Sequence, residues 1–211
     1  GDGRVGLNVV AGWNKPEYDA FGVDLPSTHP ERYGRAQEWF DVVSKLWKEK
    51  SAFDWDGEYF KLKGVYSNPQ PRQSRIPILN AAASEDGRKF AIRNADFLFT
   101  PVFDFVQAKE TVDGINAMAE QAGRKVGVCS FGQVVCRPTQ KEADEYLHYF
   151  ANENADWEAV DFLMKLQGMH AQSFSPEALA NFRDRFAAGH GAFPLTGTPD
   201  HIADQLLKLS E

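Results

Sequence analysis

The sequence predicts an α/β protein in which crossover helices connect the strands of a parallel sheet. Four strand-like apolar runs alternate with amphipathic helical patterns along the 211 residues. Such alternation is typical of parallel βαβ units. The runs are apolar on both faces, which suits a sheet that is covered on both sides. An open doubly wound sheet and a (β/α)8 barrel both fit this pattern, and four strands would make only half a barrel.

The first strand is predicted over residues 5–10, followed by a loop that contains Trp13 and Glu17. Side chains alternate between the two faces of a strand, so Asn8 is a polar residue within an otherwise buried run. A buried amide needs a hydrogen-bond partner, which is backbone, water or a ligand. The strand alone leaves a structural role and a ligand-binding role of Asn8 equally open.

A helix is predicted to begin after Thr28, because Thr28 and Glu31 have the spacing of a capping box. Arg32 and Tyr33 fall in its first turn. Free N–H groups and the positive end of the helix dipole make such a turn a phosphate site, and an arginine strengthens it. An exposed Arg32 that pairs with a nearby glutamate is the alternative interpretation.

The segment 53–60 alternates apolar and acidic residues around Asp-Gly, which predicts a hairpin. We expect it to lie beside the main sheet rather than to form a chemical site.

The second core strand is predicted over residues 76–83, and Ser84 has the position of an N-cap for the next helix. The small residues before Ser84 would let a ligand approach the backbone, whereas simple helix capping is the alternative.

A third strand is predicted over residues 95–102 and a fourth, longer strand over residues 125–136. The two cysteines, Cys129 and Cys136, lie in the fourth strand, where seven residues separate them by about 23 Å. This distance exceeds the reach of a disulfide. We therefore expect reduced core thiols, which favour a cytoplasmic protein.

The region from about 151 to 195 contains two amphipathic helical segments and no predicted strand. We interpret it as a helical insertion into a single domain over residues 1–211. Insertions over the mouth of a barrel often act as lids. The chain begins with Gly rather than Met, almost directly on a strand, and ends within a predicted helix, so we expect a fragment of a longer domain.

The composition limits the classes of partner. The net charge of −7 argues against a protein that binds nucleic acid or anionic membranes in general. No apolar run approaches the roughly 18 residues of a membrane span, and no signal peptide is visible. The five histidines show no metal-ligand spacing, so we expect no metal site.

Five segments together resemble the bacterial luciferase-like flavin monooxygenases, and within them the branch of alkanesulfonate, dimethylsulfone and pyrimidine monooxygenases. Their order and spacing hold across essentially the whole chain. The segments are Gly-Arg-Val-Gly-Leu-Asn-Val-Val-Ala-Gly-Trp-Asn-Lys-Pro-Glu-Tyr at 3–18, Glu-Arg-Tyr at 31–33, Ala-Ala-Ala-Ser at 81–84, Gly-Gln-Val-Val-Cys-Arg-Pro-Thr at 132–139 and Gly-Thr-Pro-Asp-His at 197–201.

The resemblance implies a (β/α)8 TIM-type barrel, of which this chain is a partial barrel from strand four to the helix before strand eight. Strands one to three and strand eight, with the catalytic groups that they usually carry, would be absent, and we assign no catalytic residue. The resemblance also implies reduced FMN as the cofactor. Its contacts would be Asn8, Glu17, Arg32, Tyr33 and Ser84, while Trp13 would wall the substrate side of the flavin.

The implied reaction is that of an FMNH2-dependent monooxygenase, in which a flavin peroxide oxygenates a small organic substrate of the sulfone, sulfonate or nitrogen-heterocycle class. The implied partners are molecular oxygen, the small-molecule substrate and a separate NAD(P)H-dependent flavin reductase. We also expect a homo-oligomer. Two alternatives stay open: a flavin-binding protein without catalysis, or inactive fragment of such an enzyme, and a deazaflavin-dependent oxidoreductase.

Overall fold

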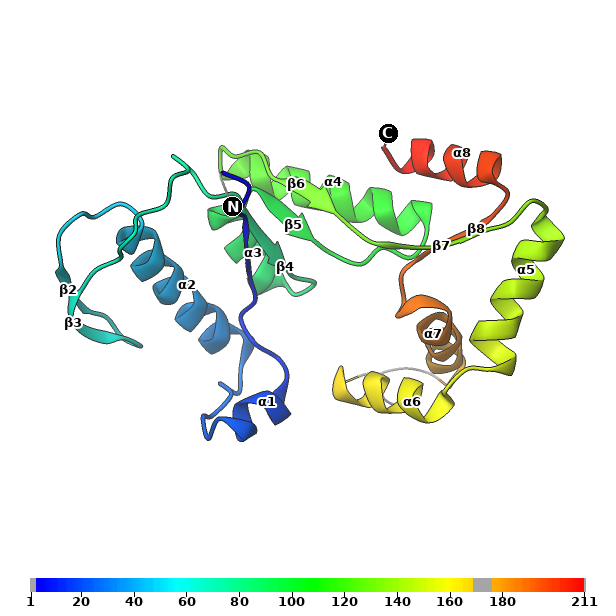
Figure 1. Cartoon of the computed structure of the whole chain (residues 1–211), viewed down its shortest axis with the longest axis horizontal. Helices are drawn as coiled ribbons and strands as arrows, with labels where there is room; N and C mark the ends of the chain where they lie inside the picture. The colour runs from blue at the N-terminus through cyan, green and yellow to red at the C-terminus, as the bar shows by residue number, and fades with distance from the viewer. Residues whose placement is uncertain (1–2, 169–175, 211) are drawn as a thin grey trace. The chain divides into compact units, whose positions relative to one another are not determined.

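The computed structural model describes residues 3–168 and 176–210, which form two compact units (Figure 1). The first unit contains the described residues up to Thr100 together with Ile115–Cys129. The second unit contains Pro101–Gly114 and the described residues from Ser130 onward.

The first unit is built on a parallel sheet whose strand order is β1-β4-β5-β6. Its strands are β1 (Leu7–Val9), β4 (Ile78–Ala81), β5 (Phe97–Phe99) and β6 (Gly127–Cys129). The helices between these strands are α1 (Lys15–Ala20), α2 (His29–Leu46), α3 (Glu85–Asn94) and α4 (Phe105–Gln121), and α4 belongs to the first unit only from Ile115 onward. All three strand pairings are parallel, which confirms the predicted α/β class with crossover helices.

The core of the first unit lies between this sheet and its helices. Leu98 of β5 and Ile115 of α4 are fully buried. The rings of Tyr33 and Phe40, both on α2, pack against Phe90 of α3 with centroid distances of 5.7 and 6.3 Å. This packing holds α2 beside α3 and brings the first turn of α2 close to the start of α3.

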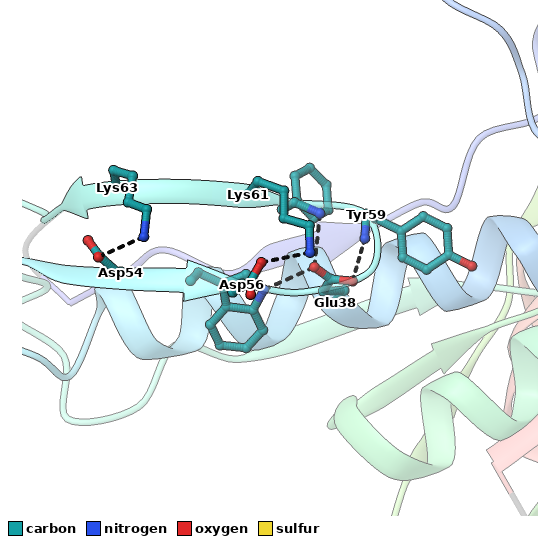
Figure 2. Close-up of polar contacts among 8 residues, drawn as sticks. Glu38, Asp54, Asp56, Tyr59, Lys61 and Lys63 are labelled. Carbon is teal, nitrogen blue, oxygen red and sulfur yellow. Dashed lines mark hydrogen bonds and ion pairs between the residues drawn. The ribbon is translucent and has the colours of Figure 1, made fainter.

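The predicted hairpin is confirmed as a separate two-stranded antiparallel sheet of β2 (Phe53–Asp56) and β3 (Lys61–Val65). Ion pairs connect its strands, from Lys61 to Asp56 at 2.7 Å and from Lys63 to Asp54 at 3.0 Å (Figure 2). These pairs are solvent-exposed, so they contribute little to stability individually.

The second unit contains the parallel pair β7 (Gly132–Cys136) and β8 (Phe193–Gly197). Its helical elements are α5 (Gln140–His148), the π-helix Tyr149–Glu153, α6 (Trp157–Leu166), α7 (Pro176–Gly189) and α8 (Pro199–Ser210). Val102, Phe193, Leu195 and Ile202 form its apolar cluster.

The prediction of one long strand over residues 125–136 is wrong, because β6 and β7 are separate strands with different partners. The N–H of Thr100 donates to the carbonyl of Cys129 at 3.0 Å, which extends the first sheet. The N–H of Phe193 donates to the carbonyl of Phe131 at 3.1 Å, in the second unit. Both cysteines are free, but Cys136 is exposed, so the expectation of a core thiol is wrong for that residue.

The helices α6 and α7 lie in the predicted insertion, but β8 begins at Phe193, so the expectation of no strand up to residue 195 is wrong. Phe193 and Leu195 are buried while Pro194 between them is exposed. The proline concealed this alternation, since proline argues against a strand. Residues 169–175 of the predicted insertion lie outside the described residues, and the lid role stays a prediction.

Candidate functional site

A cavity of about 460 Å³ lies at the C-terminal end of β1 in the first unit. Ligands of parallel α/β sheets bind at this end of the strands. The cavity contains two of the predicted site residues, Asn8 and Arg32. Its lining residues are Asn8, Val9, Val10, Ala11, Tyr18, Val23, Pro26, Arg32, Arg35, Ala36, Trp39 and Phe60.

The expectation that Asn8 is buried within its strand is wrong, since Asn8 is exposed. In the described part of the chain β1 is an edge strand that pairs with β4 alone, so the side chain of Asn8 remains open to the cavity. The buried amide is Asn80 of β4, which is fully buried and donates from Nδ2 to the carbonyl of Val9 at 2.6 Å. Its Oδ1 has no hydrogen-bond partner among the described residues.

The start of α3 forms a second polar site. Ser84 caps the helix as predicted, since its Oγ accepts a hydrogen bond from the N–H of Gly87 at 3.2 Å. The hydroxyl of Tyr33 reaches the same turn from α2. Burial raises the pKa of Tyr33, and hydrogen bonding to Ser84 partly offsets the rise. A Cβ on Gly87 would overlap both the Tyr33 hydroxyl and Ala82, so only glycine leaves room for this approach.

At the start of α2, the side chains of Thr28 and Glu31 each accept a hydrogen bond from the other residue's backbone N–H. The N–H of Glu31 donates to Oγ1 of Thr28 at 3.3 Å, and the N–H of Thr28 donates to Oε2 of Glu31 at 3.2 Å, which confirms the capping box. Glu31 places a negative charge at this helix start, which disfavours an anion there, and the phosphate site at this helix start stays a prediction. The side chain of Arg32 instead lines the cavity.

The cavity and the start of α3 lie at the same edge of the sheet. β1 and β4 are parallel neighbours in which Val9 pairs with Asn80, so their C-terminal ends meet at one edge. The cavity follows β1, and the turn that begins α3 follows β4. Arg32 and Tyr33, adjacent on α2, contribute one side chain to each place.

Neither Trp13 nor Glu17 is among the residues that line the cavity. Glu17 lies on α1, so the prediction that it belongs to a loop is wrong. Trp13 is 49% exposed in the loop after β1, and Glu17 is exposed on α1. Tyr18, the neighbour of Glu17, lines the cavity and packs against Gly12, whose φ of +93° suits glycine. The ligand-binding roles of Trp13 and Glu17 stay predictions.

Sequence reasoning did not assign the other lining residues to the site, among them Tyr18, Arg35, Trp39 and Phe60. Arg35 follows Arg32 by one helical turn, so the i, i+3 spacing could have placed both on one face of α2. Phe60 carried no such signal, because the hairpin turn reaches the cavity only through the tertiary fold.

The lining residues include two arginines and no carboxylate, so the cavity favours an anionic or electron-rich ligand. Within the described residues, no group of histidine, cysteine, aspartate and glutamate side chains has the arrangement of a metal site. No helix in the described part of the chain is long and apolar enough to cross a membrane.

The sequence model of the luciferase-like monooxygenase family matches residues 1–211. The chain belongs to this family. It is 32% identical over 216 residues to the FMNH(2)-dependent dimethylsulfone monooxygenase of Pseudomonas putida, covering 98% of this chain and 58% of that protein. It is 31% identical over 176 residues to the pyrimidine monooxygenase RutA of Acinetobacter baylyi, covering 82% and 47%.

Among solved structures, riboflavin lyase (RcaE) with modified FMN and substrate riboflavin aligns with a TM-score of 0.84 at 23% identity, covering 99% of this chain and 57% of that one. This likeness concerns the fold, and it confirms the predicted (β/α)8-type class. The chain thus spans only about half the length of each of these three proteins.

Proposed function

We propose that this chain supplies the flavin site of an FMNH2-dependent monooxygenase that oxygenates a small organic substrate. The observation that carries the proposal is the convergence of predicted site residues at one sheet edge. Asn8 and Arg32 line the cavity, while Tyr33 and Ser84 meet at the start of α3. Family membership and the names of the two curated relatives agree with this assignment.

The residues present fit the phosphate of FMN at the start of α3. Its first turn offers backbone N–H groups and the positive end of the helix dipole. The hydroxyls of Tyr33 and Ser84 add two neutral hydrogen-bonding groups beside Gly87, the position at which no side chain fits. Arg32 adds a positive charge next to Tyr33 in the sequence. Glu85 and Asp86 also lie in this first turn, and Glu85 pairs with Lys89 at 2.6 Å. We propose that a phosphate monoester binds beside the two hydroxyls and Arg32.

The cavity fits the remainder of the cofactor. Asn8 offers an amide for hydrogen bonds, and Trp39 and Phe60 offer aromatic surface. We propose that Glu17 accepts a hydrogen bond from the cofactor and that Trp13 borders the substrate. When bound, reduced FMN supplies the electrons that activate molecular oxygen; the chain binds and orients the cofactor and shields it from water.

The substrate is proposed at the level of chemical class. The curated relatives are named for a sulfone and for pyrimidines. We therefore propose a sulfone, a sulfonate or a nitrogen heterocycle. We also propose a separate NAD(P)H-dependent flavin reductase as the source of reduced FMN, a homo-oligomeric assembly and a cytoplasmic location.

The test supplies reduced FMN and oxygen to the complete gene product with sulfones, sulfonates and nitrogen heterocycles. We expect oxygen-dependent product from one class, measured by mass spectrometry with labelled oxygen. Flavin binding without turnover on any class would favour the non-catalytic alternative. A higher affinity for reduced deazaflavin than for reduced FMN would reject the cofactor assignment.

A further inference from the structure

The carboxylate of Glu38 on α2 accepts several hydrogen bonds from the hairpin of β2 and β3. Figure 2 shows Glu38 extending from α2 to the hairpin turn. Its Oε1 accepts hydrogen bonds from Nε1 of Trp55 and from the N–H of Phe60, both at 2.9 Å, and its Oε2 accepts one from the N–H of Tyr59 at 2.8 Å. A Cβ on Gly57 would collide with the same carboxylate, so the turn is shaped around it.

These three hydrogen bonds are of the strong kind, because the acceptor is charged. Burial alone would raise the pKa of Glu38, but the three donors outweigh it and lower the pKa below its usual value. The carboxylate is therefore ionised at neutral pH. Loss of its charge or reach would leave the amides of the turn without their acceptor, which favours local opening of the hairpin.

The turn held by Glu38 is also part of the cavity wall. Phe60, whose N–H donates to Glu38, lines the cavity with its side chain. The guanidinium of Arg35 lies over the Phe60 ring at 5.8 Å from the centroid, and Arg35 lines the cavity as well. Glu38 follows Arg35 by three residues on α2. One turn of this helix therefore carries both the carboxylate that holds the hairpin turn and the guanidinium that lies over Phe60.

We propose that Glu38 is a positioning residue for this cavity, which acts by fixing the hairpin turn so that Phe60 and Arg35 form one wall of the ligand site. The proposal rests on the proposed function, because FMN is the ligand used to probe the cavity. Glu38 itself is not among the lining residues and therefore acts through Phe60.

The test compares Glu38→Gln with Asp56→Asn in the complete gene product. Both variants remove one carboxylate near the hairpin, but Asp56 is exposed and pairs with Lys61 rather than with α2. For Glu38→Gln we expect hydrogen exchange at the amides of Tyr59 and Phe60 to accelerate at least about tenfold, and FMN affinity to fall by a similar factor. Asp56→Asn should leave both quantities near those of the wild type.

A double-mutant cycle separates positioning from general stabilisation. If Glu38 acts through the wall residue, Glu38→Gln should weaken FMN binding far less in a Phe60→Ala background than in the wild type. Glu38→Asp, which keeps the charge but shortens the reach, should lie between the wild type and Glu38→Gln. Independent, additive losses from Glu38→Gln and Phe60→Ala would overturn the proposal.

The failure of this proposal can be told apart from failure of the proposed function. A wild-type protein that does not bind FMN would reject both. A wild-type protein that binds FMN, together with a Glu38→Gln variant of equal affinity, would reject the positioning role alone. Thermal unfolding of each variant, measured in parallel, ensures that affinities are compared between folded proteins.

Discussion

The two helix starts of the first unit, those of α2 and α3, have similar caps but different surroundings. Thr28 and Ser84 each accept a hydrogen bond from the third residue of the helix. In α2 that third residue is Glu31, whose carboxylate accepts a hydrogen bond from the N–H of the capping residue, Thr28. In α3 it is Gly87, which has no side chain, and the hydroxyl of Tyr33 occupies part of the space instead.

This difference supports the proposal that α3 rather than α2 holds the anion. At α2 the Glu31 carboxylate accepts a hydrogen bond from the N–H of Thr28 and repels a second negative charge. The first turn of α3 also carries carboxylates, those of Glu85 and Asp86, but Glu85 pairs with Lys89, and Ser84 and the Tyr33 hydroxyl lie beside Gly87. We therefore propose that the side chain at the third position of each helix, as much as its cap, governs access of a ligand.

The largest effect is expected from Gly87→Ala, which fills the space at the start of α3. The added Cβ overlaps Tyr33 and Ala82, so we expect FMN binding to be abolished and the free energy of unfolding to fall by about 1–3 kcal/mol. Gly114→Ala in α4 is the matched control, because an added Cβ there would meet no atom within 4 Å other than its chain neighbours and the backbone of its own helix. The control should retain FMN binding and gain about 0.5–1 kcal/mol. Flavin titration and chemical denaturation measure both quantities.

The second prediction distinguishes the capping role of Ser84 from its proposed role in ligand binding. Ser84→Ala and Thr28→Ala each remove an N-cap, so each should cost about 1 kcal/mol of stability. Only Ser84→Ala should also weaken FMN binding, by about tenfold, because a hydroxyl beside a charged phosphate is lost. Equal FMN affinities of the two variants would show that both helix starts serve structure alone.

The helix caps could be predicted from the sequence because a cap is a local feature. Thr28 with Glu31 forms the predicted capping box, and Ser84 caps α3 as predicted. The class of the sheet was predictable for the same reason, since each βα alternation is read from consecutive residues. Structure that depends on neighbours within four positions was therefore accessible from the sequence.

Features that depend on distant residues were not accessible. Asn8 was predicted to be buried but is exposed, and the buried amide is Asn80, since burial depends on which strand lies at the edge of the sheet. The capping box was predicted correctly, because Thr28 and Glu31 are only three residues apart. Phe60 reaches the cavity only because Glu38, 22 residues earlier, holds the hairpin turn.

Tyr33→Phe tests the contribution of the hydroxyl that reaches α3 from α2. We expect FMN affinity to fall about two- to tenfold, the worth of one hydrogen bond. Because burial raises the pKa of Tyr33, the hydroxyl stays protonated and neutral from pH 7 to above its ordinary value of 10. The ratio of wild-type to variant affinity should therefore remain constant over that range. A ratio that changes near pH 8 would mean that Tyr33 ionises and would contradict the effect of burial on its hydroxyl.

The smallest effect is expected from Glu31→Gln at the start of α2. Hydrogen bonds from the backbone and side chain of Thr28 lower the pKa of Glu31 below its ordinary value of 4.5. A carboxyl whose pKa is lower in the folded state stabilises the protein fully above pH 4.5, and the contribution is lost as the pH falls through the folded-state pKa. The variant should thus be slightly less stable than the wild type at pH 7, and the difference should close below pH 4.5 in denaturant titrations. FMN affinity at pH 7 should be unchanged, because the phosphate is proposed to bind at the start of α3 rather than at α2; a loss comparable to that of Ser84→Ala would remove the distinction between the two helix starts.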